Sequence, residues 1–276
     1  MDAIPLPFYE AASLDNICHG LKGLRILFVN VFAISSPNNG WTLIDAGLYL
    51  SAGKIKHWAE GHFGKGAKPN AIILTHGHFD HVGALKDLLE DWNVPIYAHQ
   101  DEFPYLTGHA KYPPPDPSVG GGLMAVMSPL YPRTSVDLSG RVQPLPSDNS
   151  VPTLPGWEYI HTPGHAPGHV SLFRPEDRTL IVGDAFCTTK QESFLAVAKQ
   201  KAELHGPPSY YTPDWDAARQ SVEKLAALRP TAIAPGHGLP MCGDEVPDQL
   251  RKLAMNFDRI AVPDHGKYVH KAVSAN

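Results

Sequence analysis

The stretch that decides the fold reads Ala71-Ile-Ile-Leu-Thr-His76-Gly-His78-Phe-Asp80-His81-Val-Gly83. Its apolar beginning predicts a buried strand that delivers the chain to His76. In an extended backbone, residues two apart face the same side, so His76 and His78 can bind one ion together. The chain then turns into a helix at Asp80 and His81, which points these two side chains at a neighbouring position. Four potential ligands within six residues therefore suit two adjacent metal ions better than one.

Three later segments place a ligand-type side chain directly after a predicted apolar strand. They are His161-Thr-Pro-Gly-His165-Ala-Pro-Gly-His169, Thr179-Leu-Ile-Val-Gly-Asp184 and Ile233-Ala-Pro-Gly-His237. In the first segment, His161, His165 and His169 are competing candidates for one ligand position. Upstream, Leu43-Ile-Asp45-Ala-Gly47 likewise ends a predicted strand in a carboxylate. Histidine nitrogen and carboxylate oxygen are both ligands that zinc accepts.

The order of these motifs resembles the signature of the metallo-β-lactamase superfamily over roughly Ile26 to Ile260. The HxHxDH motif, the TPGH loop, a strand ending in aspartate and a final glycine-histidine pair occur in the family's order. The resemblance implies an α/β (α+β) chain folded as a four-layer αβ/βα sandwich, the metallo-β-lactamase fold. It places the metal site at the edge of the sheets.

The resemblance also implies a ligand set. It assigns His76, His78 and His165 to one ion, and Asp80, His81 and His237 to the other. Asp184 would bridge the two ions, and Asp45 would orient a ligand from behind. One of His161 and His169 would then support the site without binding metal. The implied cofactors are two divalent metal ions, zinc first, with manganese, cobalt and iron as alternatives.

From this site we expect hydrolysis of an ester, a lactone or a thioester by a metal-bridging hydroxide. Asp80 and Asp184 are the expected catalytic carboxylates, with Asp80 carrying a proton to the leaving group. Acyl-homoserine lactonases typically place a tyrosine three residues after the bridging aspartate, where this chain has Cys187. Two alternatives belong to other classes: a metal-dependent phosphodiesterase, and an oxidoreductase that oxidises persulfides with a single iron at the three-histidine position. A non-catalytic binding protein is disfavoured because no ligand is missing.

Short apolar runs and helical patterns alternate along the chain, which favours a layered arrangement with helices outside the sheets. A helix capped by Ser51 is predicted through Lys54–Glu60, and another over Val82–Glu90. Two more are predicted from Asp214 or Asp216 to Leu228 and from Pro247 to about Ile260. The predicted strands are Ile26–Ile34, Trp41–Asp45, Ala71–Thr75, Val94–Ala98, Trp157–Ile160, Val170–Phe173, Leu180–Val182 and Thr231–Ala234.

The segment from about Asp101 to Pro155 is rich in proline and glycine, which excludes long regular elements there. A disordered linker between two domains is one interpretation. The apolar residues in its middle instead favour a lid or binding loop over the site. We therefore predict one domain over residues 1–276 with a lid or insert at about 101–155. The predicted substrate-binding residues are Phe103, Tyr105, Met124, Met127, Tyr131, Phe186 and Lys190.

The composition makes nucleic acid and membranes poor candidates as binding partners. The chain of 276 residues has 43% hydrophobic and 18% charged residues and a formal charge of −5, with no basic cluster for nucleic acid. No run approaches the roughly 18 apolar residues of a membrane span. The beginning lacks the pattern of a secretory signal, and the three cysteines are dispersed, so we expect a cytoplasmic protein. A small-molecule substrate is the expected partner, and a homodimer is one assembly that the sequence allows.

Overall fold

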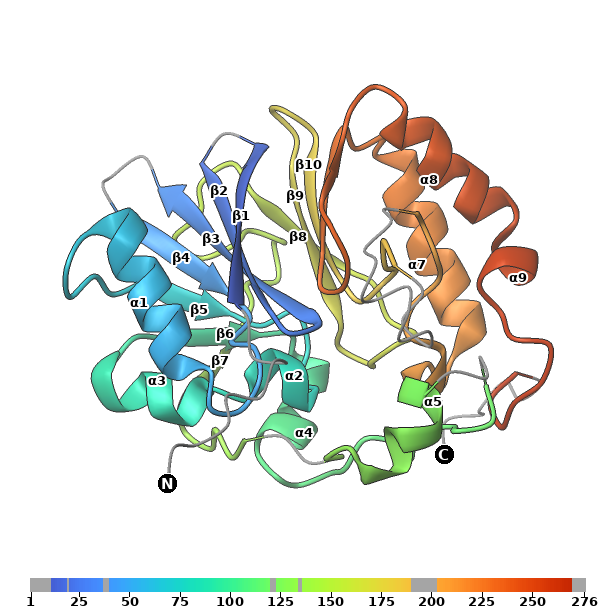
Figure 1. Cartoon of the computed structure of the whole chain (residues 1–276), viewed down its shortest axis with the longest axis horizontal. Helices are drawn as coiled ribbons and strands as arrows, with labels where there is room; N and C mark the ends of the chain where they lie inside the picture. The colour runs from blue at the N-terminus through green and yellow to red at the C-terminus, as the bar shows by residue number, and fades with distance from the viewer. Residues whose placement is uncertain are drawn as a thin grey trace, which may run out of the picture.

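The computed structural model describes residues 11–18, 20–36, 40–119, 123–133, 136–189 and 203–269. Two mixed sheets face each other, and helices cover the outer face of each (Figure 1). Helices α1 (Ala52–Phe63) and α3 (Leu85–Asp91) lie outside the first sheet. Helices α7 (Trp215–Ala227) and α8 (Val246–Met255) lie outside the second. This four-layer arrangement confirms the predicted αβ/βα sandwich. No helix in these described ranges is long and apolar enough to span a bilayer.

The first sheet has seven strands in chain order. The four strands from β1 to β4 are antiparallel, and those from β4 to β7 are parallel. Two helices, α1 (Ala52–Phe63) and α3 (Leu85–Asp91), lie in the connections between its parallel strands. The strands are β1 (Ala11–Cys18), β2 (Leu21–Ile26), β3 (Val29–Ser36), β4 (Gly40–Ile44), β5 (Ala71–Ile73), β6 (Ile96–Ala98) and β7 (Val142–Pro144).

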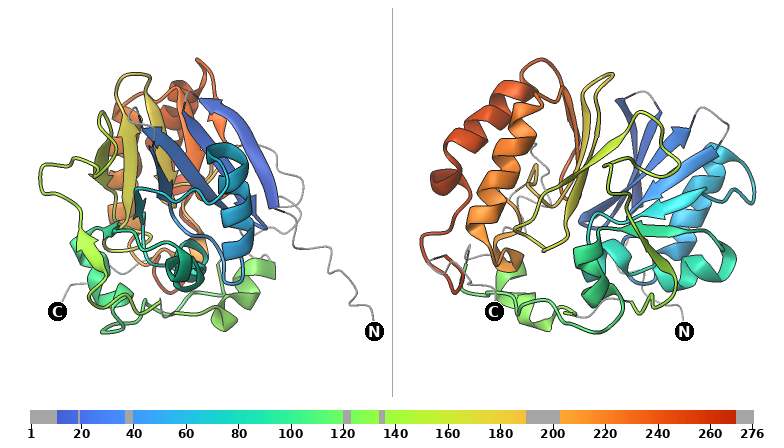
Figure 2. Two further views of the ribbon diagram at one scale, coloured as in Figure 1. Left: turned by 90° about the vertical axis from the view of Figure 1, so that its left-hand side faces the viewer. Right: turned by 180° about the vertical axis from the view of Figure 1, so that it is seen from behind.

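The second sheet has the order β12-β11-β10-β9-β8, and only β10 and β11 pair in parallel. The connection between these two strands contains helix α7 (Trp215–Ala227), which Asp214 caps by accepting a hydrogen bond from the Ala217 amide. Helices α8 (Val246–Met255) and α9 (Phe257–Ile260) follow and extend the outer layer (Figure 2). The strands are β8 (Glu158–His161), β9 (Val170–Arg174), β10 (Thr179–Gly183), β11 (Ala232–Pro235) and β12 (Met241–Cys242).

Short elements gather at one end of the two sheets, where α2, α4 and α5 are seen in Figure 1. Their lengths fit the proline- and glycine-rich sequence, which does not permit longer helices. These elements are α2 (Phe79–Val82), η1 (Gln100–Glu102), α4 (Phe103–Leu106), α5 (Leu123–Met127), η2 (Ser128–Leu130) and η3 (Ser209–Tyr211).

The core between the sheets fixes their relative position. Phe32, Ile44 and Ile73 of the first sheet pack in one buried cluster with Leu172 and Ile181 of the second. Burying one such side chain contributes roughly 1.5–3 kcal/mol to folding. Because the contacts involve both sheets, the strand ends that follow them are held facing each other.

Most predicted strands agree with the structure to within a few residues, but three elements differ from the prediction. The run Ile26–Ile34 is not one strand: a turn at Leu27, whose φ is +61°, separates β2 from β3. The predicted helix Val82–Glu90 is divided into α2 and α3. The predicted last helix ends at Met255, and a separate short helix follows. The sequence prediction also missed strands β1, β7 and β12.

The segment 101–155 is divided by the structure. Val142–Pro144 joins the first sheet as strand β7 beside β6. Beyond it, Leu145, Val151 and Leu154 are buried in the core between the sheets. The part of this segment that lies near the predicted site is therefore its first half, which includes α4 and α5.

Helices α2 and α3 are separated at Gly83, where the chain is hydrogen-bonded to the loop that follows β4. The amide of Gly83 donates to the carbonyl of Gly47 at 2.8 Å, and the amide of Ala46 donates to the carbonyl of His81 at 2.6 Å. A Cβ atom on Gly83 would lie 2.3 Å from the backbone nitrogen of Tyr49. Glycine is therefore required at position 83, since backbone atoms cannot rotate away as a side chain would.

We predict that Gly83→Ala lowers the free energy of unfolding by roughly 1–3 kcal/mol or more, the usual effect of overpacking. The matched control is Gly53→Ala in helix α1, where an added Cβ meets nothing within 4 Å. Alanine there should stabilise by roughly 0.4–1 kcal/mol, because it restricts the unfolded chain and fits the helical backbone without a clash. Urea unfolding measures both. Equal effects from the two substitutions would contradict the interpretation that the loop before Tyr49 leaves no room for a side chain at position 83.

Candidate metal centre

The seven predicted ligands meet at the end of the two sheets, although they come from four separate segments. His76 and His78 follow β5, Asp80 and His81 lie on α2, and Asp184 follows β10. His165 lies in the loop between β8 and β9, and His237 follows β11. Their ligand atoms form three overlapping groups, each within 4.8 Å: His76, His78 and His165; His76, His81 and Asp184; and Asp80, His81 and His237.

The first group consists of three buried imidazoles. Nδ1 of His78 lies 2.8 Å from Nε2 of His165, and the rings of His76 and His78 meet edge to face at 4.7 Å. Burial lowers the pKa of His78 to about 3, and it lowers the pKa values of His76 and His165 well below the ordinary range. Neutral imidazoles keep a lone pair on one nitrogen, which is the form that binds metal.

The second group is charged. Oδ2 of Asp80 lies 3.4 Å from Nε2 of His237 and 4.0 Å from Nε2 of His81. Burial alone would lower the pKa of His81, but the carboxylates of Asp184, Asp45 and Asp80 together raise it well above its usual value. The pKa of His237 is raised in the same way, mainly by Asp184 against the effect of burial. The carboxylates thus favour positive charge at this position.

Asp184 faces both groups. Its Oδ2 lies 3.4 Å from Nε2 of His165 and 3.0 Å from Nε2 of His237, and its Oδ1 lies 3.5 Å from Nε2 of His81. Burial opposes ionisation of Asp184, but His237 and His81 hold its pKa well below the usual range. The side chain is therefore a carboxylate placed between the two sets of ligands.

The residues fit a bound cation because several of their atoms are otherwise without partners. Nε2 of His76, Nε2 of His81 and Oδ1 of Asp184 are buried and have no hydrogen-bond partner among the described residues. An unsatisfied buried polar group costs roughly 1–3 kcal/mol. Glycine at position 236 also keeps the space beside Asp184 open, because a Cβ atom there would lie 2.2 Å from Oδ1 of Asp184. This donor set of nitrogen and carboxylate oxygen suits zinc or another divalent transition metal.

The carboxylate of Asp45 contacts His81 and Thr75. One carboxylate oxygen accepts the amide of Thr75, and the other accepts the hydroxyl of Thr75 and Nδ1 of His81, all at 2.8 Å. Because Nδ1 is used in this hydrogen bond, Nε2 is the nitrogen of His81 that faces Asp184 and would bind a metal ion. On the far side, Nδ1 of His237 donates to the carbonyl of Phe28 at 2.8 Å and fixes that ring similarly.

The three histidines in the segment from His161 to His169 have different partners. Only His165 joins the other ligands. Nε2 of His169 accepts the amide of Asp184 at 2.8 Å, and its Nδ1 bonds to the hydroxyl of Thr162 at 2.8 Å. Both ring nitrogens of His169 are therefore used, and this residue fixes the backbone at Asp184. Nε2 of His161 donates to the carbonyl of Pro167 at 2.8 Å, away from the centre.

A second group outside the centre, comprising His99, Asp101 and His161, also has ligand atoms within 4.8 Å. The two imidazole rings stack at 4.1 Å with only 10° between their planes. Because the nitrogen lone pairs lie in these parallel planes, they do not converge on one point. The geometry of this group is that of stacked rings beside a carboxylate rather than of a metal site.

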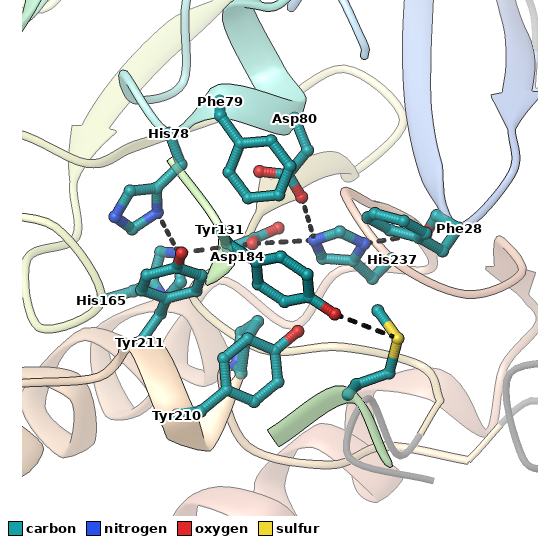
Figure 3. A pocket seen from close by; sticks show the side chains of 12 residues that line it. Phe28, His78, Phe79, Asp80, Tyr131, His165, Asp184, Tyr210, Tyr211 and His237 are labelled. Carbon is teal, nitrogen blue, oxygen red and sulfur yellow. Dashed lines mark hydrogen bonds and ion pairs between the residues drawn. The ribbon is translucent and has the colours of Figure 1, made fainter. Parts of the chain in front are cut away.

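A narrow pocket opens beside the ligands (Figure 3). Its free space is about 10 Å³, comparable to one water-sized sphere. Of the predicted substrate-binding residues, Met124 and Tyr131 line it. The sequence prediction missed the other wall residues, which come from the β2–β3 turn, the start of α2 and the η3 region: Phe28, Phe79, Pro208, Tyr210 and Tyr211.

The structure places four of the predicted substrate-binding residues elsewhere. Phe186 is fully buried in the core between the second sheet and its helices, and Phe103 packs on the core of the first sheet. Tyr105 stacks on Tyr112, and Met127 is exposed. None of these four lines the pocket. Phe103, Tyr105 and Met127 lie on the short helices α4 and α5, where neighbouring positions point in different directions. Lys190 lies outside the described residues.

Comparison with known proteins agrees with this geometry. The family model described as "Metallo-beta-lactamase superfamily" matches residues 24–237. A protein of Bacillus subtilis (strain 168), "Probable metallo-hydrolase YflN", is 48% identical over 259 residues, covering 93% of this chain and 98% of that protein.

Two solved structures are similar to the whole arrangement. TTHA1623 in a di-iron-bound form has a TM-score of 0.53 and 27% identity, covering 79% of this chain and 91% of that one. The Rm3 metallo-beta-lactamase has a TM-score of 0.57 and 20% identity, covering 84% and 80%. The fold is therefore the metallo-β-lactamase fold.

We predict that His165→Ala removes tight metal binding, because His165 lies with His76 and His78 at the centre. The matched control is His161→Ala in the same loop, whose ring faces the Pro167 carbonyl instead. Metal content after dialysis, measured by elemental analysis, should fall for the first variant and stay unchanged for the second. Equal loss in both would mean that the loop holds its ligand differently.

Proposed function

The chain belongs to the metallo-β-lactamase superfamily, and from that premise we propose that it is a dinuclear metal-dependent hydrolase of a carbonyl substrate. An ester, a lactone or a thioester is the proposed substrate class. The observation that carries this proposal is the position of the Asp184 carboxylate between the three-histidine group and the group of Asp80, His81 and His237. The name of the B. subtilis relative, a probable metallo-hydrolase, supports the same class of reaction.

Two divalent ions, zinc first, are the proposed cofactors, with manganese, cobalt and iron as alternatives. His76, His78 and His165 would hold one ion, Asp80, His81 and His237 the other, and Asp184 would contact both. The di-iron form of the similar structure supports a site for two ions. When bound, such a pair supplies a nucleophilic hydroxide near neutral pH and polarises the substrate carbonyl.

Asp80 is the proposed proton carrier. It lines the pocket, so its carboxyl group can reach a leaving group there. Burial raises the pKa of Asp80, with a further contribution from Asp184, against the opposing effect of His81 and His237. A carboxylate beside a leaving group can take up a proton and pass it on.

Tyr211 offers a hydrogen-bond donor to the substrate oxygen. Its ring lies 4.8 Å from that of His78, and its hydroxyl is buried with no hydrogen-bond partner among the described residues (Figure 3). Burial and the charge of Asp80 raise the pKa of Tyr211, so the hydroxyl keeps its proton. Such a donor stabilises negative charge that develops on a carbonyl oxygen.

The acyl-homoserine lactonases considered above typically carry a tyrosine at another position. Their tyrosine lies three residues after the bridging aspartate, where this chain has Cys187. Cys187 is buried, and its backbone pairs with that of His205, so its side chain does not line the pocket. We propose that Tyr211 supplies the phenol from the η3 segment instead.

The pocket walls favour a substrate with an apolar arm. Phe28, Phe79 and Met124 line the opening, and among the residues that the structure describes no lysine or arginine lines it. A phosphodiester carries a negative charge that these walls do not neutralise, so this alternative ranks second. Because the free space is so small, we propose that the segment carrying Met124 and Tyr131 acts as a lid that moves to admit substrate.

The oxidoreductase alternative uses a single iron at the three-histidine position. In this chain the second group is complete, since Asp80, His81 and His237 lie within 4.8 Å of one another and are buried. A complete second group favours the dinuclear hydrolase. Measured metal content distinguishes the two: one iron per chain would favour the oxidoreductase.

We predict that the metal-loaded protein hydrolyses lactones, activated esters or thioesters faster than bis(p-nitrophenyl) phosphate. The reason is the apolar and aromatic part of the pocket wall, formed by Phe28, Phe79 and Met124, which suits the apolar arm of a carbonyl substrate. Initial rates on matched substrates, with zinc, manganese or cobalt restored after chelation, provide the measurement. Phosphodiester turnover far above every carbonyl substrate would instead favour the phosphodiesterase.

We further predict that Tyr211→Phe lowers kcat on carbonyl substrates by on the order of 10²-fold, the usual effect of removing one oxyanion donor. The change should leave metal content and KM nearly unaltered, since the phenol acts on charge that develops during the reaction. Tyr105→Phe removes a hydroxyl outside the pocket and should match the unmodified protein. A Tyr211→Phe variant with unchanged kcat would remove Tyr211 from the mechanism.

A further inference from the structure

Glu102 is a fully buried carboxylate that does not belong to the ligand set. One of its oxygens, Oε2, accepts the amide of Gly77 at 2.8 Å and also accepts the hydroxyl of Tyr112. The other oxygen, Oε1, accepts the amide of Gly168 at 2.7 Å. A single side chain thus receives three hydrogen bonds, two of them from backbone amides that lie far apart in the sequence.

These two amides belong to the loops that carry the three-histidine group. Gly77 stands between His76 and His78, and Gly168 stands in the loop that begins at the end of β8 and contains His165. The carboxylate of Glu102 therefore links the loop of His76 and His78 to the loop of His165 through hydrogen bonds. Tyr112 extends the contact, since its ring lies 4.2 Å from the ring of His78.

The glycines at both positions are explained by this approach. A Cβ atom on Gly168 would lie 2.7 Å from the backbone nitrogen of Glu102 and 2.8 Å from its Cγ. A Cβ atom on Gly77 would lie 2.6 Å from the hydroxyl oxygen of Tyr112. Any larger residue would separate a loop from Glu102, and close approach is a recognised reason for glycine in a loop.

The hydrogen bonds suit the ionised form of the side chain. Burial raises the pKa of Glu102, while the bonds from Tyr112, Gly168 and Gly77 act in the opposite direction. In all three bonds the partner is the donor and a carboxylate oxygen of Glu102 is the acceptor. A carboxylate that loses these donors inside the protein would incur the full cost of its desolvation, so the loops and Glu102 stabilise one another.

We propose that Glu102 is a positioning residue that holds the loops of His78 and His165 together and thereby sets the metal affinity of the three-histidine group. It acts through the two glycine amides and touches neither metal nor substrate. Preorganised ligands lose less conformational freedom when an ion binds, which is why residues behind metal ligands commonly change affinity 10- to 100-fold, as an order of magnitude.

The test is Glu102→Gln in the full-length protein, with Co²⁺ as the probe. Glutamine keeps the size of the side chain, but its amide nitrogen cannot accept a hydrogen bond and would face a glycine amide or the tyrosine hydroxyl. We expect Co²⁺ affinity, measured by competition with a chelator, to fall on the order of 10- to 100-fold. The visible absorption spectrum of bound Co²⁺ should change as well, because the ligands are held differently.

The matched control is Asp116→Asn. The carboxylate of Asp116 is also buried and also accepts two backbone amides and one hydroxyl, from Ser118 and Lys267, but it contacts no ligand loop. Both variants should lose thermal stability. Only Glu102→Gln should change Co²⁺ affinity and the spectrum of the bound ion.

Tyr112→Phe is a second, milder variant: it removes the hydroxyl that donates to Glu102 and accepts the Gly77 amide at 3.0 Å, and it leaves the bonds from both glycine amides to Glu102 in place. It should weaken Co²⁺ binding in the same direction but by less. If Glu102→Gln folds and binds Co²⁺ as tightly as Asp116→Asn with an unchanged spectrum, Glu102 has a structural role only and the proposal is wrong. If Glu102→Gln does not fold, unchanged Co²⁺ affinity in Tyr112→Phe overturns it. These readouts concern metal alone, so they are independent of which reaction the protein catalyses.

Discussion

Burial of the Asp184 carboxylate between two sets of imidazoles is the constraint on which the rest of this structure depends. A carboxylate removed from water is costly unless positive charge or donors surround it. Nε2 of His237, Nε2 of His165 and Nε2 of His81 all lie within 3.5 Å of its oxygens. Metal ions would satisfy the same carboxylate and the lone pairs of the neutral histidines at once. A site built in this way has its ligands in place before an ion arrives.

Residues that contact the proposed ligands or their loops hold the ligands in position. Asp45 fixes the tautomer of His81, His169 fixes the backbone at Asp184, and Glu102 connects two ligand loops. Each of these contacts lies at the end of a strand whose apolar side chains are locked in the core between the sheets. The rigidity of the core therefore extends directly into the positions of the ligands, which is the condition for a precise metal site.

The substrate side is built from less regular parts. Tyr131 comes from the segment before β7, and Tyr210 and Tyr211 come from the short η3 turn before α7. Their rings pack together with Phe79 and Val119 in a small cluster over the centre. Because this cluster is separate from the sheet core, it can differ in shape without disturbing the metal ligands. The two parts of the site can thus determine different properties: metal binding from the strand ends, and substrate selectivity from the aromatic cluster.

The sequence by itself determined the fold class, most strands and six of the seven proposed ligands, because each of these six lies next to an apolar strand in a short motif. Local patterns carry such information since backbone geometry fixes where residues one to five positions apart can point. Only the tertiary structure distinguished His165 from His161 and His169, because that choice depends on the amide of Asp184 and the carbonyl of Pro167 as partners. It also supplied the contacts on which the proposed roles of Glu102 and Tyr211 rest, and it placed Phe186 in the core and Phe103 against it. These residues have no signature of their own, since their surroundings are created by segments far away in the chain that meet only when the sheets pack.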